Sequence, residues 1–403
     1  MSREVAKRNM TIMAITWAMM GPFSAATRVY SSLYFLELGA GAAEVGLISM
    51  AGLVTLGFSR LIGGYLADAV GRKRIIVPMT MIYGVASVLY AVARDWTWIL
   101  AASVLSSLAL LYQPAIQAIL ADTLPPEVRG RGLSLANMVS QLASLAGPPL
   151  ATLLVARMPL ARAMRILYAA NAAAIFGAGI VRMAFVETLK ERVRPNFRDA
   201  LRGYVSAIRE LRGDLGKLIL VSSLAPAFYQ MAFPFVQIYA VRELGVSEEF
   251  WGLISTVVSV ESVASMLASG YLTDRIGRNL TLALGYGSGS LGLAILALSP
   301  PGEPYLVLLS QVVVAAFASW PASFALMADL TPIRLRGKIM AIRGMIQGNL
   351  SGLGSGLGGA LYEVNPALPI AAAAAGLLPL VVISAKWLPA GAIENGKVRN
   401  VNH

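Results

Sequence analysis

The sequence predicts an all-α integral membrane protein of twelve transmembrane helices, arranged as two homologous six-helix bundles. Composition, segment length and internal repetition each predict this fold class. Of the 403 residues, 57% are hydrophobic and 13% are charged, whereas a soluble globular domain has roughly 25% charged residues. A chain of this length accommodates about twelve spans of about 20 residues each, joined by short loops.

Apolar stretches long enough to cross a bilayer form two sets of six. The first set covers residues 10–36, 45–67, 75–93, 97–121, 132–156 and 164–186. The second set covers residues 217–240, 250–272, 280–299, 304–328, 339–362 and 367–388. A signal peptide is the alternative for the first stretch, but the apolar run continues past Ala26 to Leu36, which favours a membrane span.

The net charge of +12 raises the alternative of nucleic-acid binding, because a basic surface attracts phosphates. The distribution of the charge argues against it. Roughly 25 of the 33 Lys and Arg lie in alternate loops and the termini, and about five lie in the opposite loops, as the positive-inside rule requires. We therefore expect a multi-pass plasma-membrane protein with both termini in the cytoplasm and no nucleic-acid partner.

Residues suited to catalysis or metal binding are scarce. The chain has no Cys, which excludes disulfides and Cys-ligated zinc, and its one His is His403 at the C-terminus. The sequence shows no cluster of catalytic residues such as an enzyme would need, and no loop long enough for the soluble domain of a receptor. We expect no enzymatic activity, no metal and no cofactor.

Sliding the sequence on itself by 206 or 207 positions reveals an internal repeat. The matching positions are Glu37-Leu38-Gly39 with Glu243-Leu244-Gly245, Gly46-Leu47-Ile48-Ser49 with Gly252-Leu253-Ile254-Ser255, Pro114-Ala115 with Pro321-Ala322, and Asp122, Pro125, Arg129 and Gly130 with Asp329, Pro332, Arg336 and Gly337. Parallel repeats of this kind place a binding site between the halves, near the bilayer midplane.

The repeat divides the chain into four segments. Residues 1–186 form the N-terminal six-helix bundle and residues 217–388 the C-terminal one. Between them, residues 187–216 place apolar side chains on one helical face and arginines on the other, which predicts an amphipathic helix on the cytoplasmic membrane surface. A solvated linker is the alternative. Residues 389–403 form a cytoplasmic tail.

The loop after the second span carries a motif of glycines and charges. It reads Gly64-Tyr65-Leu66-Ala67-Asp68-Ala69-Val70-Gly71-Arg72-Lys73-Arg74, and its second copy reads Gly270-Tyr271-Leu272-Thr273-Asp274-Arg275-Ile276-Gly277-Arg278. The two copies resemble the signature loop of the major facilitator superfamily of secondary transporters, and Val186-Glu187-Thr188 is similar to the family's segment after the sixth span. The resemblance covers nearly the whole chain. Ala69 departs from it, because the family has a basic residue there.

The resemblance implies that these loops form a cytoplasmic gate. In it, Asp68 and Asp274 would pair with nearby arginines and with a helix N-terminus of the other half. The gating residues are Gly64, Asp68, Gly71 and Arg72 with their copies Gly270, Asp274, Gly277 and Arg278. Gly71 and Gly277 supply tight turns, while the glycines that open each motif allow close helix approach. Charges that only fix the topology are the alternative.

Charged residues well inside a membrane span cost about 2.5 to 3.5 kcal/mol each, and three candidates stand out among them. Glu261 lies near the middle of its span and could gain and lose a proton as access alternates, which makes it the candidate for proton coupling. A structural pair with an arginine is the alternative. Arg28 and Arg343 lie nearer the membrane surfaces, where snorkelling competes with a role in substrate binding.

The resemblance implies that the first, fourth, seventh and tenth spans line a central cavity. On three of these spans and at the two arginines, the substrate-cavity candidates are Arg28, Gln113, Gln117, Gln230, Phe233, Gln237, Gln311, Phe317, Trp320, Phe324 and Arg343. Ordinary helix packing is the alternative for the aromatic stripe. A mostly apolar cavity with scattered amides suits amphiphilic organic solutes better than strongly charged metabolites.

These features predict a secondary transporter that alternates access to one site, couples to protons and exports its substrate. Gly147-Pro148 resembles a motif of the family's exporters, although Ala143 and Ala151 stand where that motif has glycines. A proton-coupled importer or facilitator of a small nutrient is the alternative. We expect the partners to be a small-molecule substrate, protons and the lipid bilayer, with the protein acting as a monomer.

Overall fold

Helices form nearly all of the chain that the structure describes. The computed structural model describes residues 3–123, 138–189, 208, 211–331, 335–390, 393–394 and 397–398, without the side chains of residues 3, 68, 121, 393–394 and 397–398. Within this range the chain divides into two compact units, Met1–Phe197 and Arg198–His403. Most of the expected linker helix, residues 190–207 and 209–210, lies outside the described residues.

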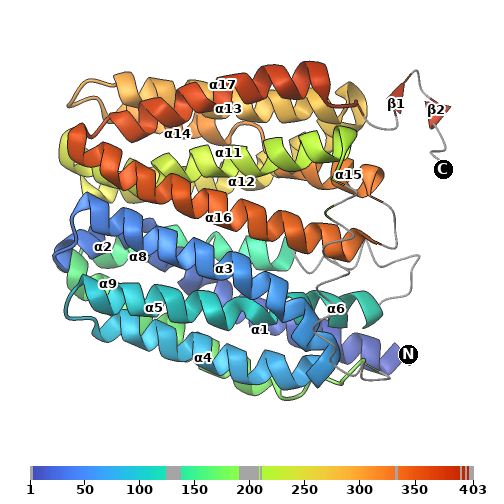
Figure 1. Ribbon diagram of the computed structural model, residues 1–403. Helices are drawn as coiled ribbons and strands as arrows, with labels where there is room; N and C mark the ends of the chain where they lie inside the picture. The colour runs from blue at the N-terminus through green and yellow to red at the C-terminus, as the bar shows by residue number, and fades with distance from the viewer. Residues whose placement is uncertain are drawn as a thin grey trace. The chain divides into compact units, whose positions relative to one another are not determined.

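The first unit is a bundle of helices. Its elements are α1 (Arg3–Val29), α2 (Ser31–Glu37), α3 (Ala42–Val70), α4 (Arg72–Val92), α5 (Trp96–Ala109), the 3-10 turn η1 (Leu110–Tyr112), α6 (Gln113–Thr123), α8 (Gly147–Val155) and α9 (Leu160–Arg182). Residues 138–144 are also helical and lead into α8. Within the unit, α9 packs against both α1 and α4, and α3 packs against α5 (Figure 1).

The second unit repeats this organisation. Its elements are α11 (Gly213–Ile238), the π turn η2 (Tyr239–Glu243), α12 (Glu248–Ile276), α13 (Arg278–Leu298), α14 (Pro304–Ala315), α15 (Trp320–Leu330), α16 (Arg336–Val364), α17 (Leu368–Trp387), β1 (Ile393–Glu394) and β2 (Lys397–Val398). Here α11 packs along α16 and α13 along α17 (Figure 1). The two short strands pair antiparallel, with Ile393 opposite Val398.

Local sequence explains where these helices begin and end. Gly71 and Gly277 adopt φ of +111° and +91°, so each ends one helix and starts the next without an intervening loop. The Ser247 hydroxyl accepts a hydrogen bond from the backbone N–H of Phe250 and caps α12. Proline in the first turn of α14 and α15 fits positions whose N–H groups need no helical partner.

Ten segments of the described residues are long and apolar enough to cross a membrane. They are Ala42–Ala67, Arg72–Val92, Trp96–Leu120, Met138–Val155, Leu160–Arg182, Gly213–Glu243, Glu248–Ile276, Arg278–Leu298, Pro304–Leu330 and Leu368–Trp387. The first and eleventh expected spans correspond to α1 with α2 and to α16. Charged residues in the first turns of α1, and cationic residues and glycines in α16, make these two helices less apolar than the others.

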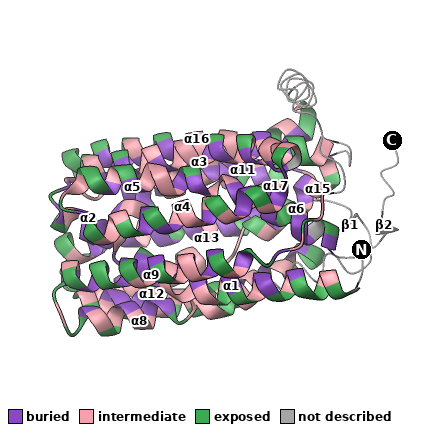
Figure 2. Cartoon of the chain, turned by 90° about the horizontal axis from the view of Figure 1, so that it is seen from below, coloured by how far each residue is buried: buried purple, intermediate pink, exposed green. Residues whose placement is uncertain are grey.

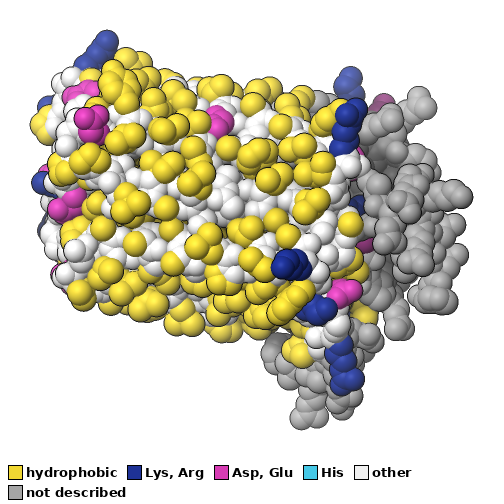
Figure 3. All heavy atoms as spheres, turned by 90° about the horizontal axis from the view of Figure 1, so that it is seen from above, with side chains coloured by type: hydrophobic (Ala, Val, Ile, Leu, Met, Phe, Trp, Pro, Cys, Tyr) yellow, Lys and Arg dark blue, Asp and Glu magenta, His cyan; other side chains and the backbone are white. Residues whose placement is uncertain are grey.

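The surface is consistent with a bilayer as solvent. Hydrophobic side chains cover most of the face seen in Figure 3, and most of its Lys, Arg, Asp and Glu lie toward the ends of the helices. Along individual helices, buried and exposed residues alternate, so that each helix has a packed side and an open side (Figure 2). Exposed leucines such as Leu267 and Leu291 belong to the open sides.

Glycine brings particular helix pairs into close contact. A Cβ added to Gly354 or Gly358 of α16 would overlap a backbone carbonyl of α11, that of Ala227 or Met231. In the first unit, a Cβ on Gly63 would overlap the Leu111 carbonyl. Helices in lipid associate through such backbone contact, since apolar side chains gain little by leaving an apolar solvent.

Candidate functional site

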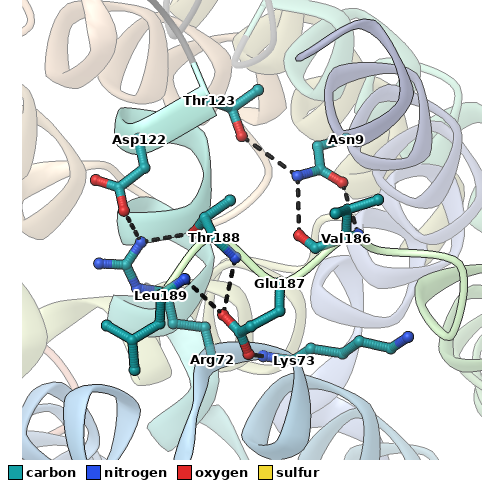
Figure 4. Close-up of polar contacts among 9 residues, drawn as sticks. All are labelled: Asn9, Arg72, Lys73, Asp122, Thr123, Val186, Glu187, Thr188 and Leu189. Carbon is teal, nitrogen blue, oxygen red and sulfur yellow. Dashed lines mark hydrogen bonds and ion pairs between the residues drawn. The ribbon is translucent and has the colours of Figure 1, made fainter. Parts of the chain in front are cut away.

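An ion pair stands at the end of the first unit that contains the predicted gating loop (Figure 4). Arg72, the first residue of α4, pairs with Asp122 near the end of α6. The same Arg72 Nη1 donates a hydrogen bond of 2.8 Å to the Thr188 hydroxyl, in the segment that follows α9. The arginine is mostly buried and the aspartate only partly so, and their contact joins three parts of the bundle.

Glu187 caps the start of α4 beside that ion pair. Its Oε2 accepts a hydrogen bond from the backbone N–H of Lys73 at 3.0 Å, and its Oε1 accepts from the N–H groups of Thr188 and Leu189 at 3.0 and 3.1 Å (Figure 4). A carboxylate at a helix N-terminus satisfies free N–H groups and interacts favourably with the helix dipole. The segment after α9 is thereby fixed to α4.

Asn9 of α1 completes this arrangement from within the bundle. Its amide is fully buried and pairs with the backbone of Val186, accepting from the N–H at 2.9 Å and donating to the carbonyl at 3.1 Å. It also donates to the Thr123 hydroxyl of α6 at 3.3 Å (Figure 4). Together, the contacts of Asn9, Arg72 and Glu187 define what we call the first-unit strap, residues Val186–Leu189 with their partners.

The second unit has a corresponding ion pair. Arg278, the first residue of α13, pairs with Asp329 of α15 and donates to the carbonyl of Ala325 at 3.1 Å. Its backbone N–H donates to the carbonyl of Ala390, which follows α17, at 3.0 Å. A backbone carbonyl thus takes the place at this helix start that the Glu187 carboxylate occupies in the first unit.

Each arginine pairs with an aspartate of a later helix, Arg72 with Asp122 and Arg278 with Asp329. The resemblance implied that Asp68 and Asp274 also pair with nearby arginines, and Asp274 interacts electrostatically with Arg278. Asp68 lies in α3, but its side chain is outside the described residues. Asp274 is exposed at the end of α12.

The two glycines that open the gating motifs have open space within their own units. An added Cβ on Gly64 would make only an ordinary contact of 4.0 Å with the Pro114 side chain, and one on Gly270 would meet nothing within 4 Å. In the first unit the close approach that we expected at Gly64 occurs one residue earlier, at Gly63. Gly71 and Gly277 form the expected turns.

Glu261 lies in the middle part of α12, as expected. Its Oε2 is buried and makes no hydrogen bond with any described residue, and no ion pair with Arg343 is found among those residues. A carboxyl group whose oxygen is buried without a hydrogen-bond donor is more stable when protonated. The alternative is that a partner binds this oxygen during only part of the transport cycle.

The two interior arginines have different surroundings. Arg343 of α16 is buried and donates hydrogen bonds to Ser222 of α11 and Ser323 of α15, at 3.2 and 3.0 Å. Its guanidinium carbon lies 5.1 Å from the centre of the Phe324 ring. Arg28 at the end of α1 is exposed.

The remaining cavity candidates differ in burial and in their contacts within their own units. Trp320 and Phe324 meet edge to face, with ring centres 5.9 Å apart, and are exposed. Gln237 is buried, with its Oε1 lacking a hydrogen bond among the described residues. Of the others, Gln113, Gln230 and Phe317 are half-buried, Gln117 is exposed, Gln311 is buried against Ser310, and the exposed Phe233 stacks on Tyr229.

Sequence reasoning missed several polar residues of these bundles. Asp122 and Asp329 were detectable, because they match each other in the repeat at an offset of 207. Asn9 and Arg182 gave no such signal. Arg182, at the end of α9, is only 1% exposed; it donates to the Thr80 hydroxyl at 2.8 Å and lies over the Tyr112 ring. No group of three or more His, Asp or Glu within the described ranges could hold a metal ion.

Known proteins share this sequence pattern and fold. The profile of the Major Facilitator Superfamily matches residues 9–235 and again 218–402. The chain is 30% identical over 121 residues to a Na(+), Li(+), K(+)/H(+) antiporter of Planococcus maritimus, and 32% identical over 93 residues to a 3-(3-hydroxy-phenyl)propionate transporter of Escherichia coli K12. These matches span only 28% and 23% of those two relatives.

Solved structures match along nearly the full length. A variant of the nucleoside transporter NupG superposes with a TM-score of 0.77 at 14% identity, covering 95% of this chain and 100% of that one. A variant of the peptide transporter POT in complex with sulfate superposes with a TM-score of 0.75 at 15% identity, covering 95% and 97%. At such low identity the likeness concerns the fold.

Proposed function

This chain belongs to the Major Facilitator Superfamily, and we propose that it is a secondary active transporter that exports small organic solutes in exchange for protons. Alternating access of one site to the two membrane faces is the mechanism. We propose twelve spans, the ten apolar segments plus α1 with α2 and α16, with both termini in the cytoplasm of a plasma-membrane protein acting as a monomer.

Glu261 carries the proposal of proton coupling. An ionisable group in the middle of a membrane helix is costly, and the buried Oε2 of Glu261 has no described hydrogen-bond donor to offset that cost. Protonation removes the charge, and exposure to one membrane face at a time allows the proton to leave on the other side. The group can therefore link proton movement to the conformational cycle.

The ends of the helices near Arg72 and Arg278 supply the proposed gate. Each unit places an Arg–Asp pair at the start of the helix that follows a glycine turn. In the proposed cycle, Asp68 and Asp274 of the preceding helices contact the opposite unit when the cytoplasmic side is closed. Weakening the gate would slow the exchange between states, while leaving substrate binding in place.

The direction of transport rests on weaker observations. The name of the Planococcus maritimus relative includes antiport with protons. Gly147 packs so closely on α1 that an added Cβ would lie 2.6 Å from the Pro22 carbonyl oxygen. Close packing at a Gly-Pro sequence in this helix supports the resemblance to exporters. Import of a small nutrient is the second candidate, and the name of the Escherichia coli relative, a transporter of an organic acid, leaves it open.

The variant Glu261→Gln tests the coupling role, because Gln preserves the shape of the side chain but cannot release a proton. Purified wild type and variant are reconstituted in proteoliposomes, and substrate exchange is measured with and without an imposed pH gradient. We expect gradient-free exchange to persist and gradient-driven transport to fall at least tenfold. Glu249→Gln, an exposed position in the first turn of the same helix, is the matched control and should behave as wild type.

Thermal stability separates coupling from a structural role. If Glu261 served only to neutralise a buried cation, the Gln variant would lose stability, by about 3 to 5 kcal/mol for a broken buried pair. A stable Gln variant that the pH gradient still drives normally would disprove the coupling role. The sign of the gradient that accumulates substrate inside the vesicles distinguishes antiport from symport, and hence export from import.

A further inference from the structure

Arg343 is a buried cation that lacks a carboxylate partner among the described residues. It is 8% exposed and lies on α16, about two turns from the start of that helix. Nε donates to the Ser222 hydroxyl and Nη2 to the Ser323 hydroxyl. Both partners are neutral, so the hydrogen bonds hold the guanidinium in place between α11, α15 and α16 without neutralising its charge.

The other buried arginines show why this matters. Arg72 and Arg278 have aspartates. Arg182 also has a hydroxyl partner and an aromatic ring, those of Thr80 and Tyr112, but it is 1% exposed and enclosed in the core of its bundle. Arg343 differs from Arg182 because exposed aromatic side chains adjoin its guanidinium.

Those aromatic side chains form a continuous surface with the arginine. The guanidinium lies over the ring of Phe324, which is 47% exposed. One turn earlier on α15, Trp320 is 52% exposed and meets Phe324 edge to face. Helix α15 begins at Trp320 and ends at Leu330, and Asp329, the partner of Arg278, lies near its end. Trp320 is therefore farther from that ion pair than Phe324 is. The surface therefore runs from a fixed positive charge along two rings.

We propose that Arg343, Phe324 and Trp320 form a binding site for an aromatic monocarboxylate, which is the substrate class of the transporter; this rests on the proposed function. A carboxylate matches the planar fork of a guanidinium and supplies the one negative charge that the site lacks. The rings offer faces and edges against which an aromatic group packs. Ser222 and Ser323 keep the guanidinium oriented while the site is empty. A second carboxylate on the ligand would be left without a cation at this site.

Binding to the purified full-length protein tests the site without requiring transport. The probes are 3-phenylpropionate, its neutral amide 3-phenylpropanamide, and butyrate, which keeps the carboxylate but has no ring. By isothermal titration calorimetry at neutral pH, we expect wild type to bind the aromatic acid at least about tenfold more tightly than either analogue. The amide loses the charge-assisted hydrogen bond to the guanidinium, and butyrate loses the contact with the rings.

Two variants assign the contributions. Arg343→Gln should bind the acid and the amide equally, whereas Phe324→Leu should weaken both and keep the acid's advantage. Arg182→Gln, which removes a buried arginine with similar partners outside the site, is the matched control and should keep the wild-type ratio. If Arg343→Gln does not fold, the ratio of the affinities for the acid and the amide, measured in wild type and in Phe324→Leu, tests the proposed site instead.

Equal binding of acid and amide by wild type, or no binding of the acid, would overturn the proposed site. Gradient-driven transport of some other solute would then still support the proposed function. Conversely, selective binding of the aromatic acid with no transport of it in proteoliposomes would support the site while contradicting the proposed function. The two proposals therefore fail by different measurements.

Discussion

The arginines that begin α4 and α13 show how one glycine brings a charged residue to a partner distant in sequence. Asp68 and Arg72 are four residues apart, as are Asp274 and Arg278, a spacing that pairs side chains on one continuous helix. Gly71 and Gly277 end the preceding helices within that interval. Each arginine therefore starts a new helix and pairs with an aspartate distant in sequence, Asp122 or Asp329 in the two units.

The sequence identified both arginines, but it did not predict their pairs with Asp122 and Asp329, because ion pairing depends on the direction in which a turn sends the next helix. Glu261 and Arg343 were identified because a charge inside an apolar stretch is conspicuous. Asn9 was not, because a single amide near the start of a span carries no such signal, although its side chain contacts both α6 and Val186.

We expect Asp122→Asn to destabilise the first unit by about 1 to 3 kcal/mol, because it removes the carboxylate that pairs with the mostly buried Arg72. Transport should slow more than substrate binding weakens if the pair belongs to the gate. The measurements are thermal unfolding in detergent and proteoliposome uptake. Asp214→Asn breaks the exposed Lys217–Asp214 pair and should cost under about 1 kcal/mol. Equal losses in the two variants would contradict a special role for Asp122.

At the scale of elements, hydrophobic length predicted most helices, but it did not predict their interruptions. The expected span 304–328 consists of α14 and α15, with a break between Ala315 and Trp320. The span 97–121 contains the 3-10 turn η1, and α11 ends in the π turn η2. These irregular turns consist largely of the same apolar residue types as the helices around them, so hydropathy does not reveal them.

The pairing of α11 with α16 gives a prediction at this scale. Gly358→Ala places a methyl group against the Met231 carbonyl, so the two helices must separate or shift, and we expect a loss of about 1 to 3 kcal/mol in stability. Gly337→Ala on the same helix meets nothing within 4 Å and is the control. The measurement is the thermal unfolding of both variants. A Gly358→Ala protein as stable as the Gly337→Ala control would refute the close packing of α16 on α11 at this position.

At the scale of the whole molecule, the internal repeat was the most informative feature of the sequence. It predicted two units with corresponding turns, and the membership of the Major Facilitator Superfamily confirms the resemblance drawn from the motif copies. Hydropathy did not mark all twelve spans in the structure, because α1 and α16 carry charged residues and glycines that make these two helices less apolar than the others.

Membrane topology is the prediction that belongs to this scale. In the Cys-free chain, Lys73→Cys should not react with a membrane-impermeant maleimide added to intact cells, because position 73 lies in the basic first turn of α4, which is expected on the cytoplasmic side. Arg94→Cys, in the loop between α4 and α5, should react because one span separates the two positions. Labelling of position 73 but not of position 94 would invert the topology.

The first-unit strap determines where the first half of this protein can be separated from the second. A polypeptide truncated at Arg182, the end of α9, would lose the backbone that Asn9 binds at Val186 and the carboxylate that caps α4 at Glu187. One truncated after Leu189 would keep both. Co-expressed half-proteins, fluorescent fusions or cleavage sites inserted between the halves should therefore begin after Leu189, since contacts of the first half continue seven positions beyond the end of α9.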